Sequence, residues 1–499
     1  MTRKRFLSDL MFPAPILAGM LVCHVFSTLW VYAANSGLYE KMALLAKSGY
    51  VTVPNPVTAP LLKTFATAFY GGLFFTFTLG AGLCVLSFFL FRFWFRFFPR
   101  APKKVAAALF SGIFLLIAVF LNKDGFVLFP TLIALSVPAT VILISALVAR
   151  YSGSSPSLLM STFFIVPLVI LSLAWGGHKD DDLFDHLRDD VLLSGGPGIA
   201  FVDFYYRYTL YPTEPIKPLA ARLIKSARIT GQAQPATLAP IYRALIKNDY
   251  LPVKSEGPVD LSLNVKGSVV TLSGGGKIID EIGLQAFVQK PDRHLSEFSK
   301  KLDNMAASRT FMGFGLLFGF PLVLYSLCFG FVSALVGLML APAPASFATG
   351  LLGVVLGLLL LFPLSSASKA RDRDIRELIA SGSRSERLTG LRQASEKGIP
   401  VCNLAGFDKI LKSSAIVERR WAAEALASGG CPETGQMLAG LLNDPHPYVR
   451  CHAVLSLSRI GASYATDTLL DILRTSNHWY LETYSYSAAR SLGWHQQAQ

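Results

Sequence analysis

The residue types best suited to chemistry gather in one acidic stretch that runs from His178 to Asp190. On a helix, Asp182, His186 and Asp190 stand four residues apart and share one face. Two carboxylates and an imidazole so arranged could hold a divalent metal, or supply an acid and a base at a membrane surface. A solvated helix whose carboxylates complement the N-terminal dipole is the simpler interpretation. We therefore predict no metal, no cofactor and no catalytic residue, and keep these three as the candidates for a metal site.

Cysteine and glycine patterns add no further chemistry. The six cysteines include no CxxC pair, so we expect neither a zinc site nor a disulfide framework. The glycines from Gly195 to Gly198 lack the lysine that a phosphate-binding loop requires, and they are typical of a turn.

The elements that must position any site are mostly apolar. Hydrophobic residues make up 52% of the 499-residue chain and charged residues only 16%, which is too apolar for an ordinary soluble protein of this length. Uncharged runs of 18 or more residues can cross a hydrocarbon core of roughly 30 Å. Seven runs at or near that length predict transmembrane helices: Phe12–Ala34, Phe65–Phe91, Val105–Leu121, Phe126–Ala149, Leu158–Gly176, Phe311–Leu340 and Ser346–Leu364.

The surplus of basic residues lies mainly beside these apolar runs. The net charge is +14, yet residues 177–308 carry as many acidic as basic residues, so the surplus lies mainly in short loops. Such loops face anionic lipid and stay in the cytoplasm, and a nucleic-acid partner is not expected. Basic residues at Arg3–Arg5 and at Arg92–Lys104 place the N-terminus inside. We expect a protein of the bacterial cytoplasmic (inner) membrane, with both water-exposed parts on one side, facing outward.

Charge is absent within the seven runs, which disfavours an ion or proton pathway. Small residues recur there at helix-packing spacing, in the pairs Gly315 with Gly319 and Gly353 with Gly357. Close helix packing within one bundle is the simpler interpretation, and association with a partner's helices is the alternative.

The water-exposed middle segment predicts a small α+β domain. Residues 236–251 have helical spacing and stop at Asn248. Alternating residues from Val259 to Val265 and from Val269 to Leu272 predict a β-hairpin, with another turn at the following glycines. An aromatic stretch, from Phe201 to Tyr211, either packs as a cluster or lies against lipid headgroups.

The C-terminal segment is repetitive. Glycines recur at intervals of about one helical hairpin, at Gly398, Gly430, Gly461 and Gly493, and eleven residues before them stand Arg387, Arg419, Arg450 and Glu482. Residues 366–499 resemble the short HEAT repeats of the phycobilisome-lyase-like class, whose second helix carries VRxxAAxAL before a glycine. Val449, Arg450 and Ala453 match this pattern, as do Arg419, Ala422 and Ala423, and Glu482 departs from it.

This resemblance implies a stack of about four repeats with a face that binds a protein partner, and it implies no lyase activity. Trp421 and His452 occupy equivalent positions, with Tyr484 in the fourth copy. Packing between repeats and anchoring of a partner are both open for them. The predicted partner-binding residues are Arg419, Trp421, Arg450, His452 and Tyr484.

The sequence thus predicts a mainly α, polytopic membrane protein with about seven transmembrane helices, an inserted α+β domain and a C-terminal α-solenoid. Its parts are a membrane domain with five helices (1–176), a soluble domain (177–308), a transmembrane hairpin (309–364) and HEAT-like repeats (365–499). The favoured function is a membrane scaffold or assembly protein that binds a protein partner through the repeats. A permease-like component for a lipid or hydrophobic solute is the alternative, followed by a membrane-surface enzyme that uses residues 178–190.

Overall fold

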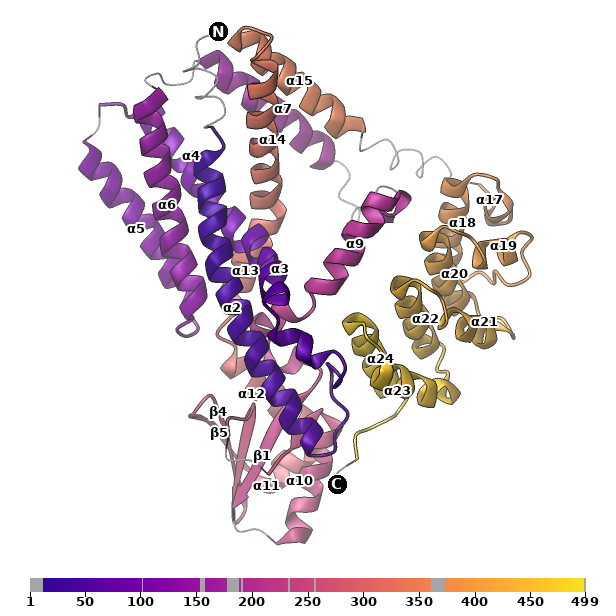
Figure 1. The fold of residues 1–499 in the computed structure, drawn as a ribbon. Helices are drawn as coiled ribbons and strands as arrows, with labels where there is room; N and C mark the ends of the chain where they lie inside the picture. The colour runs from indigo at the N-terminus through magenta and orange to yellow at the C-terminus, as the bar shows by residue number, and fades with distance from the viewer. Residues whose placement is uncertain are drawn as a thin grey trace.

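The computed structural model describes residues 12–100, 102–152, 158–176, 188–189, 192–231, 234–254, 257–359 and 373–497. Within them the chain is mainly helical and contains one five-stranded sheet. Figure 1 shows a bundle of long helices, a sheet domain beyond one end of the bundle, and an array of short helices at its side. The first helix starts at the end of the bundle farthest from the sheet.

Within the described residues, each of the seven apolar runs is mainly helical, as the sequence predicts. Two of the helices contain a π turn, η2 (Thr76–Gly80) and η7 (Gly315–Gly319). The bundle consists of α2 (Ala14–Lys47), α3 (Phe65–Phe75) continued through η2 into α4 (Ala81–Phe97), α5 (Lys103–Leu121), α6 (Leu128–Ser152), α7 (Leu158–Gly176), α13 (Ala306–Phe314) continued through η7 into α14 (Phe320–Val336), and α15 (Pro342–Leu359).

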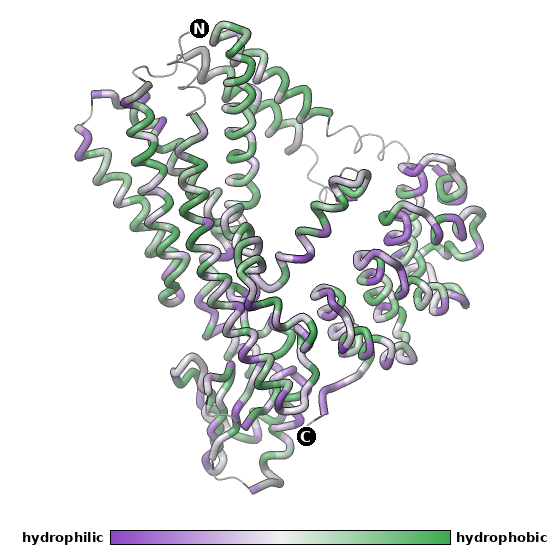
Figure 2. Tube along the Cα trace, in the orientation of Figure 1, coloured by the Kyte–Doolittle hydropathy of each residue, from purple (hydrophilic) through white to green (hydrophobic). Residues whose placement is uncertain are grey.

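Five of these helices are long and apolar enough to cross a membrane: 14–47, 65–97, 103–121, 128–150 and 306–336. The predicted fifth and seventh spans occur among the described residues as shorter apolar helices, Thr162–Ala174 and Ala343–Leu359. The number seven therefore stays a prediction. The bundle is almost continuously hydrophobic in Figure 2, whereas the array and the sheet domain are mixed.

Small residues bring the two π turns together. A Cβ atom added at Gly315 would meet the carbonyl oxygen of Thr78 at 2.0 Å, and one at Gly319 would meet the backbone of α4 at 2.6 Å. Gly357 similarly faces α7 at 2.4 Å, and Gly353 makes an ordinary contact with α14. The packing interpretation is confirmed for Gly315, Gly319 and Gly357. Association with a partner through these glycines stays a prediction.

The sheet domain contains the predicted helix and hairpin, together with three strands that the sequence did not reveal. The strand order is β2-β1-β3-β4-β5, in which β1 is parallel to β2 and β3, and the last three strands are antiparallel. The unpredicted strands are β1 (Lys225–Gly231), β2 and β5. The other elements are α10 (Pro235–Lys247), β2 (Tyr250–Pro252), β3 (Leu261–Lys266), β4 (Val269–Gly274), β5 (Lys277–Gly283), α11 (Leu284–Gln289) and α12 (Pro291–Leu302).

Short helices link this domain to the bundle and form the array. Between α7 and β1 lie η4 (Leu192–Ser194), α9 (Gly196–Tyr208), η5 (Tyr211–Ile216) and η6 (Leu219–Ala221), and η1 (Ala59–Lys63) follows α2. The array consists of α17 (Ile375–Ala380), α18 (Arg384–Lys397), α19 (Phe407–Leu411), α20 (Ile416–Gly429), α21 (Thr434–Leu441), α22 (Pro447–Arg459), η8 (Ser463–Ala465), α23 (Thr466–Thr475) and α24 (Trp479–Ser491).

Helix α2 joins the three parts. Its 34 residues span about 51 Å, well beyond a hydrocarbon core of roughly 30 Å. Near its end, Met42 and Leu45 are buried in a core that also contains Leu251 of the sheet domain and Leu473 and Tyr486 of the last repeat. The end of α2, the sheet domain and the last repeat therefore meet in one hydrophobic cluster, in addition to the separate cores of the bundle, the sheet domain and the array.

Candidate functional site

The repeat register predicted from glycine spacing is confirmed by backbone conformation. Gly398, Gly430, Gly461 and Gly493 have positive φ angles of 63°, 59°, 70° and 93°. They follow α18, α20, α22 and α24, where a left-handed residue ends a helix and favours glycine. The second helices of the repeats thus line up, and Figure 1 shows them on the face of the array that is turned toward the bundle. We call this the inner face.

The arginines at the start of these helices form ion pairs and a hydrogen bond within the array. Arg387 lies 2.7 Å from a carboxylate oxygen of Glu418, and Arg419 lies 2.6 Å from one of Asp444. Arg450 donates to the carbonyl of Leu442 at 3.1 Å. Two of the predicted partner-binding residues, Arg419 and Arg450, are therefore engaged within the array. Their use by a partner stays a prediction.

A segment of the same chain covers the inner face. Residues 188–189 and 192–209, which we call the docked segment, lie between the array and the bundle (Figure 1). Leu193 and Val202 are buried in the hydrophobic core of the array. The ring of Tyr206 lies 5.7 Å from that of Tyr448 and 4.7 Å from that of Tyr480.

The opposite side of α9 contacts the bundle. Phe204 and Tyr208 lie 5.0 and 4.8 Å from the ring of Tyr70 on α3. Part of the aromatic stretch therefore packs as a cluster, as one of the two interpretations predicts. Phe201 and Tyr205 are 57% and 47% exposed.

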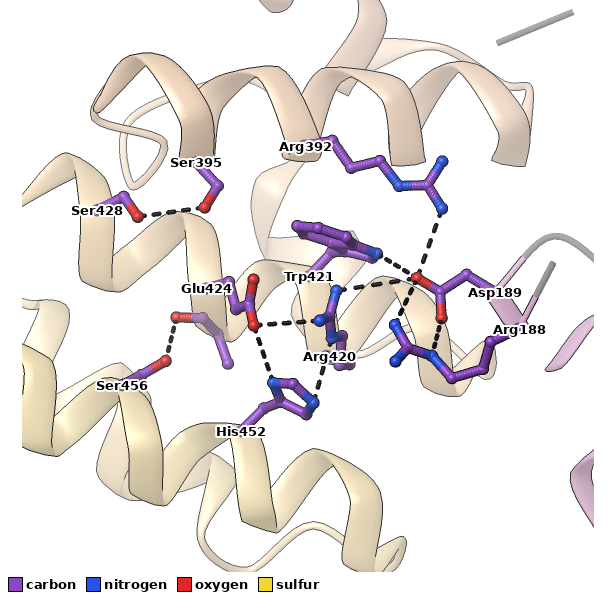
Figure 3. A network of polar contacts seen from close by, with 11 residues as sticks. Arg188, Asp189, Arg392, Ser395, Arg420, Trp421, Glu424, Ser428, His452 and Ser456 are labelled. Carbon is purple, nitrogen blue, oxygen red and sulfur yellow. Dashed lines mark hydrogen bonds and ion pairs between the residues drawn. The ribbon is translucent and has the colours of Figure 1, made fainter. Parts of the chain in front are cut away.

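Polar contacts fix the start of the docked segment, as Figure 3 shows. Asp189 is fully buried and accepts a hydrogen bond of 2.8 Å from the indole N–H of Trp421. The same oxygen, Oδ2, lies 3.5 Å from Arg392 and 3.8 Å from Arg420, and Arg188 binds Oδ1 at 2.8 Å. Burial by itself raises the pKa of Asp189, but the hydrogen bond and charge of Arg188 and the charges of Arg420 and Arg392 prevail and lower it.

A second carboxylate, that of Glu424, belongs to the same network. Glu424 lies 3.2 Å from Arg420 and 3.0 Å from Nδ1 of His452. Burial opposes the charge on Glu424, but His452 and Arg420 lower its pKa to about 2. Burial, with the charge of Arg420, lowers the pKa of His452 to about 4. His452 is therefore neutral at pH 7, with Nδ1–H donating to Glu424 and Nε2 accepting from Arg420 at 3.3 Å.

The predicted residues Trp421 and His452 therefore meet in one network, together with Asp189, Arg392 and Arg420. Spacing did not reveal the last three. Tyr484 lies 6.1 Å from Tyr480, on the neighbouring part of the inner face. Trp421 and His452 make the contacts expected from packing, and their role in holding a partner stays a prediction.

The fourth repeat docks on the loop after α2. Glu482, which replaces the arginine of the other repeats, is fully buried and accepts from the backbone N–H of Asn55 at 2.8 Å and the hydroxyl of Thr58 at 2.9 Å. The amide of Asn55 donates to the carbonyls of Leu473 and Ser476 at 3.0 and 2.9 Å. Burial raises the pKa of Glu482 to about 7.

The sheet domain is tied to both neighbours. Asp249 lies 2.8 Å from Arg490 and accepts from the hydroxyl of Tyr486 at 2.6 Å, both on α24. Asp260 lies 2.8 Å from Lys41 near the end of α2. The array is thus held from two sides.

A disulfide joins Cys402 and Cys431, whose Cα atoms are 6.4 Å apart. The sequence indicates no disulfide framework and does not predict this single bond. The two residues are 29 positions apart in sequence and have no motif spacing, and only the stacking of successive repeats brings them together.

The three metal candidates, Asp182, His186 and Asp190, lie outside the described residues. Within the part of the chain that the structure describes, no group of three or more His, Cys, Asp or Glu side chains could hold a metal ion.

Comparison with known proteins gives a match within the array. A family model described as HEAT repeats matches residues 405–493, which confirms the resemblance for that segment. No curated protein and no solved structure matches the chain.

Proposed function

We propose that this chain is a multi-pass membrane scaffold or assembly protein that presents its HEAT array to a protein partner. The observation that carries the proposal is the way the array is held. Contacts from Asn55 and Thr58 to Glu482 and from Asp249 to Arg490 fasten it to the end of α2 and to the sheet domain. Stacked HEAT repeats commonly form extended surfaces for protein binding, and an array fastened in this way has a defined orientation.

Membrane insertion of the bundle is supported by what its surface displays. Leu21, Leu116 and Leu173 are 67%, 69% and 73% exposed on three different helices. Exposed large hydrophobic residues also occur on the other long helices of the bundle, and they gain a favourable environment only when lipid surrounds them. Seven spans are the expected number, with α7 and α15 as the two shorter ones.

Two independent features support an outward orientation of the sheet domain and the array. The basic residues from Arg92 to Lys104 lie at the end of α4 and the start of α5, at the end of the bundle away from the sheet domain, as Figure 1 shows, and basic residues at such a junction favour the cytoplasm. The array contains the Cys402–Cys431 disulfide, and disulfides persist mainly in oxidising compartments. We place the array on the outer surface of a bacterial cytoplasmic membrane.

Photo-cross-linking in cells tests the docking function. A photo-reactive residue in place of Tyr464, which is 67% exposed on the array, should give a discrete adduct with one protein. The matched control replaces Ile278, which is also 67% exposed but lies on the sheet domain. If Tyr464 and other exposed array positions give no adduct beyond the Ile278 background, the proposed function is wrong.

A further inference from the structure

Arg92 places a positive charge at the end of the bundle away from the sheet domain. It lies on α4, five residues before this helix ends at Phe97, and its side chain is partly buried. Its Cζ atom lies 4.8 Å from the ring centre of Phe12 and 5.1 Å from that of Phe88. These two rings also pack edge to face, 5.5 Å apart. Aromatic contacts from two helices therefore fix the position of the guanidinium group.

These contacts leave the hydrogen-bond donors of Arg92 without an acceptor. Within the described residues, Arg92 makes no ion pair and no side-chain hydrogen bond. A guanidinium has five N–H donors in one plane, and contact with aromatic rings supplies none of them with an oxygen. Because a charge beside lipid is costly without a partner, this arrangement indicates a binding site for an anion.

The helices around Arg92 supply no anion. Arg96 follows one turn later on the same face of α4, where its like charge repels that of Arg92. The sequence contains no acidic residue between Glu40 and Asp124, which belong to the opposite end of the bundle, and none in α7, α14 or α15. Asp9 lies outside the described residues, and the experiment below tests it.

The surroundings of Arg92 favour a lipid as the source of the anion. Phe97, at this end of α4, is 64% exposed, as aromatic side chains at a membrane interface often are. Leu17 and Leu21, on the first turns of α2, are 46% and 67% exposed. A phospholipid at this site would place its phosphate beside Arg92 and its acyl chains against such apolar side chains. A free phosphate would use only the charge.

We propose that Arg92, together with Arg96, binds the phosphate group of an anionic phospholipid in the cytoplasmic leaflet. The inference goes beyond the proposed docking function and rests only on the membrane insertion and orientation described with it. The ring of Phe12, which holds Arg92, also lies 5.9 Å from that of Phe164 on α7. The bound lipid therefore stabilises the place where α2, α4 and α7 meet.

Lipid binding to the full-length protein in detergent, measured by native mass spectrometry, tests the proposal. The probes are phosphatidylglycerol and phosphatidylcholine with identical acyl chains. The wild-type protein should prefer phosphatidylglycerol by at least about fivefold, because only this lipid has a net negative charge, and Arg92→Gln should lose most of the preference. The matched control, Arg150→Gln, removes an exposed arginine at the same end of the bundle, on α6, and should keep the preference.

Four results overturn the proposal. Equal binding of the two lipids to the wild-type protein means that no anion site exists. Equal losses in Arg92→Gln and Arg150→Gln mean that the basic surface as a whole attracts the lipid. Displacement of phosphatidylglycerol by inorganic phosphate, compared with chloride at the same ionic strength, means that the site binds the free anion. A preference that appears only in Asp9→Asn means that Asp9 is the anion that Arg92 binds.

Thermal unfolding of the wild-type protein decides the matter if Arg92→Gln does not fold. Phosphatidylglycerol should raise the melting temperature more than phosphatidylcholine does, and equal shifts overturn the proposal. If the lipids are not distinguished while Tyr464 cross-links a partner, the docking function stands and the lipid site fails. A lipid preference without any cross-linked partner means the reverse.

Discussion

Replacement of Glu482 by Ala should loosen the junction between the array and α2. The change leaves the backbone N–H of Asn55 buried without its acceptor, whereas the hydroxyl of Thr58 keeps the side-chain oxygen of Asn55 at 3.3 Å. An unsatisfied buried group costs about 1 to 3 kcal/mol, so the docked junction should lose roughly that amount. Glu482→Gln is the matched control, because its amide oxygen can still accept from both groups.

The protonation of Glu482 predicts how the wild-type junction depends on pH. Burial raises the pKa of this carboxyl from 4.5 to about 7, so the docked state holds the proton more tightly than the open state. The junction is therefore most stable at pH values below about 4.5 with respect to this group, and it loses stability as the pH rises through 7. The free energy of the docked junction should differ by roughly 3 kcal/mol between low and high pH, and Glu482→Gln should abolish this difference.

Amide hydrogen exchange at Asn55 measures both effects, because that N–H donates directly to Glu482. After correction for the intrinsic exchange rate, the Ala variant should exchange at least about fivefold faster than wild type at pH 6. Wild type should open more readily at pH 8 than at pH 5, and the Gln variant should show no such trend. Unchanged exchange in the Ala variant, or a flat wild-type profile, would refute the reasoning.

Two other substitutions test the bundle and the array. Gly315→Leu should lower the melting temperature of the bundle, because its Cβ atom would lie 2.0 Å from the carbonyl oxygen of Thr78. The control Gly313→Leu should be tolerated, because a Cβ atom there meets nothing within 4 Å. Equal melting temperatures of the two variants would contradict this. Cys402→Ser should destabilise the array by about 2 to 4 kcal/mol in denaturant unfolding and make it insensitive to reductant, and a variant as stable as oxidised wild type would contradict this.

Periodic features were predictable from the sequence. The seven apolar helices follow from local spacing, because a long apolar run in lipid must be helical to satisfy its backbone hydrogen bonds. The glycine register also follows from local spacing, because Gly430 and Gly461 need a left-handed conformation. Strand β1 was missed because its residues, Lys225 to Gly231, do not alternate clearly between apolar and polar.

The site itself depends on long-range contacts that local spacing does not contain. Asp189 and Trp421 are 232 positions apart, and nothing near Asp189 distinguishes it from the other carboxylates of the acidic stretch. Glu482 stood out only as a departure from the arginine of the other repeats. Its acceptor role follows from the loop at Asn55, which α2 brings to the array by extending past the predicted end of its span, Ala34.

Labelling of engineered cysteines in sealed cells tests most directly whether the array lies at the outer surface of the cytoplasmic membrane. Ser383→Cys on the array and Ser268→Cys on the sheet domain are compared with Lys103→Cys at the start of α5, all at exposed positions, in a Cys328→Ser background. A membrane-impermeant maleimide should label the first two and label Lys103→Cys only after permeabilisation. Labelling of Lys103→Cys in sealed cells, with the other two protected, would contradict the proposed orientation.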